Sequence, residues 1–165
     1  MRARVEVRFL LVGLMLSPAL AVSQATATCL SGLHGAWRGS GRVAGRDVVM
    51  HQSWRPAMGG AFTELVMTHR LPTDTARVVF EGRGFYRAVG DTIAGTWMDA
   101  RGYTMALRGS CTDRTLSMEW SGAERGATNY TRHTDGTLEV VDLVDTPGGR
   151  REFGRSRLRG ASGTS

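Results

Sequence analysis

Short apolar runs separated by turn residues recur along the whole chain, and this pattern constrains the fold more than any other feature. The stretch from Gly82 to Gly109 shows it best. Three segments with apolar or aromatic residues at alternate positions are joined at residues 89–91 and 99–102, where glycine and aspartate occur. These residue types let the backbone reverse at low steric cost. The stretch therefore predicts a β-meander of three antiparallel strands.

The same period of two continues on both sides of this meander, and no stretch of ten residues has helical spacing. Because every connection is short, consecutive strands must pair antiparallel. A sheet of this width loses its exposed edges only by closing, and a barrel of this size encloses a cavity. The predicted fold class is all-β, an antiparallel up-and-down β-barrel of about ten strands, with strands at 35–43, 46–55, 60–71, 77–87, 91–98, 103–109, 114–121, 126–134, 137–145 and 150–158.

The N-terminal 25 residues have the organisation of a secretory signal peptide. Three arginines occur within residues 1–8, an apolar run follows at 9–16, and small residues follow the Ser17-Pro18 break. The run is too short to span a bilayer comfortably. We therefore expect a signal peptide at 1–25, one barrel domain at 26–165, a periplasmic or secreted location, and no stable membrane insertion after cleavage.

Cys29 and Cys111 are the two cysteines of the sequence. In an exported protein an isolated pair favours a disulfide, and two thiols alone cannot complete a tetrahedral zinc shell. The bond would tie the segment before the first strand to the turn at 110–113. That segment, Cys29 to His34, is long enough for a single helical turn.

Alternation along the strands divides their residues into two faces. The face rich in charged side chains is expected to point to solvent. The opposite face is predicted to form the interior, and it comprises Val78, Phe80, Tyr86, Tyr103, Met105, Leu107, Leu116, Met118, Trp120, Leu138 and Val140.

Several function classes find no support in the sequence. The formal net charge is +6, but the arginines are scattered, and no recognition helix or basic aromatic platform indicates nucleic-acid binding. The string from Gly39 to Ala44 matches a dinucleotide-binding pattern, yet no helix follows it, which indicates a glycine-rich strand and turn. No Gly-x-Ser-x-Gly elbow occurs, and the four histidines lack metal-binding spacing. We therefore predict no catalytic residue, no metal site and no cofactor.

An interior rich in aromatic and thioether side chains suits an apolar or amphipathic small ligand as well as a packed core. His51, His69 and Trp54 could meet across paired strands and face the same cavity. By alternation most strand carboxylates, which are Glu64, Glu81, Glu119, Glu139 and Asp142, are expected to point to solvent. The candidate ligand-binding residues are Trp54, Phe80, Tyr86, Tyr103, Met105, Met118, Trp120, His51 and His69.

Two sequence features resemble the calycin superfamily of lipocalin-like barrels. One is Gly35-x-Trp37 in the first strand, and the other is the arginine-rich last strand at 155–159. The hairpin from Gly95 to Gly102, with the glycine-rich turn at 59–62, is similar to an uncharacterised lipocalin-like family of exported bacterial proteins. The resemblance implies a barrel with a cavity rather than a reaction, and an arginine of the last strand that stacks on Trp37 and bonds to the opening turn.

The resemblance leaves two alternatives to simple ligand binding. Some calycins convert the compound they bind, and this would require titratable groups converging inside the barrel, such as His51 with Glu64. The related nitrobindins are ten-stranded barrels that hold haem through a histidine on a late strand. His133 is the only late histidine in this sequence, and the haem alternative would use His69 or His133.

Overall fold

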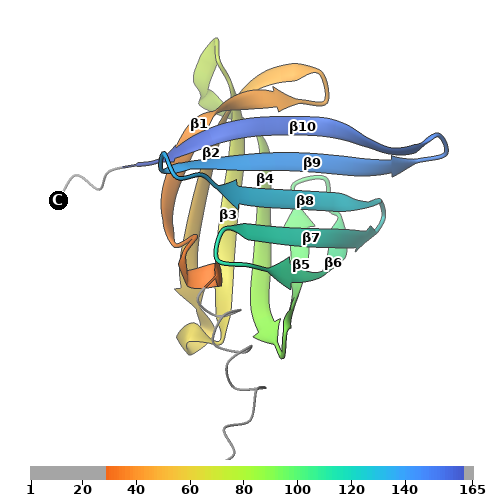
Figure 1. Ribbon diagram of the computed structural model, residues 1–165. Helices are drawn as coiled ribbons and strands as arrows, with labels where there is room; N and C mark the ends of the chain where they lie inside the picture. Colours follow the sequence, from red (N-terminus) through yellow and green to blue (C-terminus); the bar gives the residue numbers. More distant parts are fainter. Residues whose placement is uncertain (1–28, 162–165) are drawn as a thin grey trace, which may run out of the picture.

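Ten antiparallel strands form one closed ring in the computed structural model, which describes residues 29–161 (Figure 1). Each strand pairs with its neighbours in the sequence, and β1 pairs with β10 to close the barrel. The expected fold class is thereby confirmed, while the predicted signal peptide lies outside the described residues. The strands are β1 (Gly35–Val43), β2 (Arg46–Ala57), β3 (Phe62–Leu71), β4 (Asp74–Val89), β5 (Thr92–Asp99), β6 (Thr104–Cys111), β7 (Thr115–Gly122), β8 (Arg125–Arg132), β9 (Thr137–Thr146) and β10 (Gly149–Gly160).

Alternation places one side of every strand in the interior. On β2 the buried residues Met50, Gln52 and Trp54 are two apart, and the residues between them are at least partly exposed. Eight residues of the predicted interior face are buried, namely Tyr86, Met105, Leu107, Leu116, Met118, Trp120, Leu138 and Val140. Phe80 is partly buried and packs against this core.

The prediction was wrong for Val78, whose exposed fraction is 40%. The register between β3 and β4 shifts at this point: His69 pairs with Phe80, but Arg70 pairs with Val78, so Val79 has no partner. Such a bulge reverses the alternation beyond it, because one extra residue changes the face of those that follow. Val78 therefore does not share the face of Phe80.

Tyr103 was also expected in the interior, but it lies in the β5–β6 turn, ahead of β6. There the Arg101 guanidinium lies 4.5 Å from the centre of the Tyr103 ring. Asp99 stabilises the same turn by an Asx-turn hydrogen bond, in which its Oδ1 accepts the Arg101 backbone N–H at 2.9 Å. Tyr103 thus belongs to the turn and not to the barrel wall.

The glycines of β1 are required by close packing. Cβ atoms added at Gly39 and Gly41 would lie 2.0 Å from the Arg157 carbonyl oxygen and 2.3 Å from the Arg155 carbonyl oxygen, both on β10. The dinucleotide-like string is therefore a strand that must approach another strand closely, as expected from its context.

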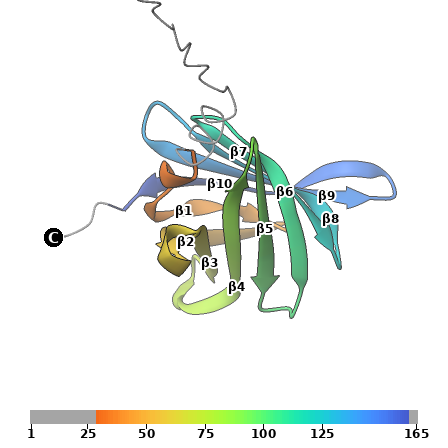
Figure 2. The same cartoon turned by 90° about the horizontal axis from the view of Figure 1, so that it is seen from below.

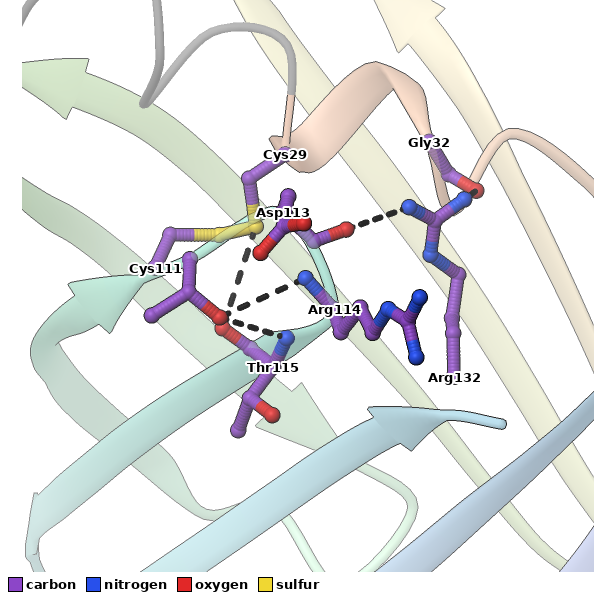
Figure 3. Close-up of a disulfide and its surroundings, with 8 residues drawn as sticks. Cys29, Gly32, Cys111, Asp113, Arg114, Thr115 and Arg132 are labelled. Atoms are coloured by element: carbon purple, nitrogen blue, oxygen red, sulfur yellow. Dashed lines mark hydrogen bonds between the residues drawn. A yellow bond between two sulfur atoms is a disulfide. The ribbon is translucent and has the colours of Figure 1, made fainter. Parts of the chain in front are cut away.

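One end of the barrel is covered by the segment before β1. A helical turn at 29–31 places Leu30 and Leu33 in the buried core. The Cys29–Cys111 disulfide, with Cα atoms 6.0 Å apart, fixes this turn to the end of β6 (Figure 3). The predicted disulfide is confirmed.

Arg132 of β8 ties the same segment to the barrel (Figure 3). Its guanidinium donates to the Gly32 carbonyl at 2.9 Å and also to the Asp113 carbonyl. A side chain at Gly32 would meet the guanidinium, since an added Cβ would lie 2.9 Å from the Arg132 Cζ. Trp37 completes the contact by donating from Nε1 to the Leu33 carbonyl at 2.8 Å.

The expectation of an arginine from the last strand in this role was therefore wrong. Arg155 makes ion pairs with Glu139 and Glu152, and Arg157 makes one with Asp135. The Gly32 carbonyl of the opening turn instead accepts a hydrogen bond from Arg132 of β8.

The opposite end of the barrel carries the longest projection of the fold. The β9–β10 hairpin extends beyond the neighbouring turns in both views (Figure 1 and Figure 2). Residues at the start of β10, at the β1–β2 turn and at the β5–β6 turn border the mouth of a cavity at this end.

Candidate functional site

An open cavity of about 1050 Å³ occupies the interior on the side of the β9–β10 hairpin. Its wall is formed mainly by aromatic, aliphatic and thioether side chains, and charged residues border its mouth. This volume is at the upper end of the range for small-molecule sites, about 300–1000 Å³. The predicted cavity is thus present, and its wall has the chemistry of a site for a largely apolar molecule.

The structure brings six of the candidate ligand-binding residues together around this cavity. They are His69, Phe80, Tyr86, Met105, Met118 and Trp120. Trp54 lies deeper, with an exposed fraction of 1%, and does not line the cavity. Its ring packs 5.3 Å from Tyr86 and 5.1 Å from Tyr130, so it supports the wall from behind.

His51 does not join them, contrary to expectation. It lies on β2 between the buried residues Met50 and Gln52, and strand alternation places it on the outer face. The pKa of His51 is lowered by partial burial and by the nearby guanidinium groups of Arg38 and Arg70. The proposed meeting of His51 with His69 in one cavity is therefore wrong.

Glu64 does not line the cavity either. Its side chain is buried, but it is held by Arg55 at 2.7 Å and Arg83 at 3.5 Å, residues with largely exposed side chains. Glu64 lies between Thr63 and Leu65, and Leu65 shares the inward face with Trp54, its register partner. His51 and Glu64 are thus both on the outer face and cannot converge inside the barrel.

His69 is the histidine that faces the cavity. Its ring lies 5.0 Å from that of Phe80, and its Nε2 is buried with no hydrogen-bond partner among residues 29–161. Burial lowers the pKa of His69 to about 4. The imidazole is therefore neutral near neutral pH, and its Nε2 is a ring nitrogen in the cavity wall without a hydrogen-bond partner in the described structure.

Asp142 of β9 lines the same cavity and ends a chain of hydrogen bonds. The Trp120 Nε1 donates to the Thr128 hydroxyl at 3.3 Å, and that hydroxyl donates to the Asp142 Oδ1 at 2.7 Å. Burial raises the pKa of Asp142 to about 6, and the negative charge of Glu152 acts in the same direction. Asp142 is thus a carboxyl group in a largely apolar interior.

Alternation could have identified Asp142 from the sequence. Leu138 and Val140 were both assigned to the interior, and Asp142 is the next residue of the same parity. Asp142 is therefore an exception to the expectation that most strand carboxylates point to solvent. Because β9 continues beyond the packed core into the cavity wall, a polar residue is tolerated at this inward position.

The cavity lining includes five arginines, and two of them are paired with carboxylates. Arg101 bonds to Asp99 and Glu124, and Arg155 bonds to Glu139 and Glu152. Arg42, Arg46 and Arg151 also line the cavity, and none of the three has a carboxylate partner among the residues that the structure describes.

The fold and the cavity together define a class, the closed antiparallel barrels that have an interior cavity open at one end. Comparison with models of protein families gives no match, and neither does comparison with curated proteins. Within residues 29–161 there is no cluster of three or more His, Cys, Asp or Glu side chains able to hold a metal ion. Over the same residues, no helix has the length and apolar character needed to cross a membrane.

Proposed function

We propose that this chain is an exported barrel that binds a small apolar or amphipathic ligand in its interior without converting it. The observation that carries the proposal is the cavity of about 1050 Å³, whose wall combines aromatic and thioether side chains with a few buried polar groups. A mostly apolar wall supplies affinity through burial, and isolated polar groups orient the ligand.

Export is supported by the arrangement of residues 1–25 and by the Cys29–Cys111 disulfide, because such bonds persist mainly in oxidising compartments. Relationship to the calycins is part of the same proposal. It rests on the closed barrel, on Trp37 in β1, and on a guanidinium that bonds to the opening turn. Arg132 provides that guanidinium in place of the residue expected from the last strand.

A cavity-filling variant tests ligand binding. Leu107 lines the cavity from β6, and Leu107→Trp adds an indole to the space that a ligand would occupy. The neutral probe N-phenyl-1-naphthylamine should increase its emission on binding the wild-type protein. We expect Leu107→Trp to weaken this binding at least about tenfold, which corresponds to about 1.4 kcal/mol.

The matched control is Ala106→Trp, which places the same indole on the outer face of the same strand. This variant should bind the probe like the wild-type protein. An absence of enhanced emission with the wild-type protein would contradict the proposal, and so would an equal loss of binding in both tryptophan variants.

Haem binding is the second candidate function. It is favoured by the Nε2 of His69, which has no hydrogen-bond partner in the described structure. His133 does not line the large cavity; it lies 3.7 Å from Glu139 in an ion-pair arrangement. If haem binds, addition of haemin should produce a Soret band that His69→Ala removes and His133→Ala retains. A band that is unchanged in His69→Ala, or no band in the wild-type protein, would contradict haem ligation by this residue.

A further inference from the structure

We propose that the cavity selects ligands that carry a protonated amine, with Asp142 as the group that receives it. This inference rests on the proposed binding function and specifies the chemistry of the ligand. Three features of the structure support it: the available oxygen of Asp142, the lack of a protein cation beside it, and the aromatic rings around it.

The first feature is that only one carboxylate oxygen of Asp142 is used within the described part of the chain. Oδ1 accepts the Thr128 hydroxyl at 2.7 Å, while Oδ2 has no hydrogen-bond partner there. The register partner of Asp142 on β10 is Gly154, and an added Cβ at Gly154 would lie 3.0 Å from Oδ2. Glycine at this position keeps the oxygen uncovered, and Asp142 is part of the cavity wall.

The second feature is electrostatic. Among residues 29–161, Asp142 makes no ion pair, and the charged side chain that acts on its pKa is Glu152, another carboxylate. The hydrogen bond that it accepts comes from the neutral Thr128 hydroxyl, and its charge also acts on two neutral phenols, Tyr86 of β4 and Tyr130 of β8. A carboxylate enclosed in a largely apolar cavity is costly unless a cation pairs with it, so a ligand cation would remove a cost that the protein leaves uncompensated.

The third feature is the aromatic character of the surrounding wall. Trp120, which begins the hydrogen-bond chain to Asp142, packs edge-to-face on Phe153 at 6.5 Å. Tyr86 and Tyr130 also line the cavity. Aromatic faces attract alkylammonium groups, and this attraction strengthens when water is excluded. A carboxylate among aromatic rings therefore discriminates in favour of an amine over a carboxylate or an alcohol.

The arginines at the mouth support the opposite selectivity. Arg42, Arg46 and Arg151 have no carboxylate partner in the described structure and could attract an anionic headgroup. They lie at the entrance, however, where solvent and salt screen their charge. Asp142 lies inside the barrel, where screening is weaker, and we expect it to dominate the selectivity.

Displacement of N-phenyl-1-naphthylamine by decylamine, decanol and decanoate, each below its micellar concentration, tests the inference because the three differ only in the headgroup. At pH 7.5 decylamine should displace the probe at a concentration at least about tenfold lower than decanol. Asp142→Asn should remove this difference, since asparagine can still accept the Thr128 hydroxyl but carries no negative charge to pair with the amine. Asp91→Asn, at an exposed turn, is the matched control and should retain the preference.

The wild-type protein provides a second measurement that needs no variant. The preference for decylamine should decrease as the pH falls from 7.5 to 5, because Asp142 becomes protonated while the amine keeps its charge. Equal displacement by decylamine and decanol would overturn the inference and leave the proposed binding function intact. Stronger displacement by decanoate would overturn it in favour of the mouth arginines. A wild-type protein that does not bind the probe would overturn the proposed function itself.

Discussion

Replacement of both cysteines by serine is expected to lower the free energy of unfolding by about 4 kcal/mol. The Cys29–Cys111 bond joins residues separated by 82 positions, and a cross-link over such a distance removes much of the conformational entropy of the unfolded chain. For a domain of this size the loss corresponds to a decrease in Tm of about 8–16 °C. Urea denaturation of the wild-type protein and of Cys29→Ser/Cys111→Ser, without reductant, measures it.

The disulfide also fixes the helical turn that contributes Leu30 and Leu33 to the core, so its loss should first release the covered end of the barrel. Dithiothreitol provides the control, because it should destabilise the wild-type protein and have no effect on the double serine variant. Probe binding at the opposite end should persist at temperatures where the variant remains folded. Equal stability of the two proteins would show that the bond contributes nothing beyond the contacts of Arg132 and Trp37.

Asp142→Asn should make the protein more stable above pH 6, by about 3 kcal/mol. The pKa of this carboxyl group is about 6 in the folded protein, against an ordinary value of 3.8. Between these two values the folded state binds more protons than the unfolded state, so stability decreases as the pH rises through this window. The difference between the two pKa values, at about 1.4 kcal/mol per pKa unit, is the expected increase in the free energy of unfolding when the neutral asparagine replaces the carboxylate.

The comparison must be made between the two proteins at each pH, because His69 titrates in an overlapping range with the opposite sign. The pKa of His69 is lowered from 6.5 to about 4, so its contribution to stability is present above pH 6.5 and is lost as the pH falls. The difference between wild type and Asp142→Asn isolates the carboxyl group. It should be small at pH 4 and largest above pH 6, and a difference independent of pH would contradict the assignment.

The sequence was sufficient to predict the ten strands, their order and the closed barrel. Turn residues such as Gly90 and Gly102, which have positive φ in the structure, mark the reversals, and short connections leave no other pairing than antiparallel neighbours. The disulfide also followed from cysteine number and the expected compartment.

The predictions from sequence failed where a single residue determines which face of a strand a side chain occupies or which side chain makes a contact. The bulge at Val79 changes the face of Val78, and nothing in the local composition distinguishes it from regular strand. His51 was expected inside although its parity on β2 differs from that of Trp54, and register across strands cannot be derived from one sequence. Arg132 has its role because the fold brings the carbonyls of Gly32 and Asp113, distant in sequence, within its reach.

If the barrel binds a ligand as proposed, its covered end determines the order in which ligands can exchange. Cys29, Leu30 and Leu33 belong to the packed core, and none of the three lines the large cavity. A long ligand would therefore enter and leave through the same open end of the cavity. One end of the ligand would lie deep in the barrel, and the other would stay accessible to a membrane or another protein. One ligand would have to leave before a second could enter. The dissociation rate of the first ligand would therefore limit the rate of exchange.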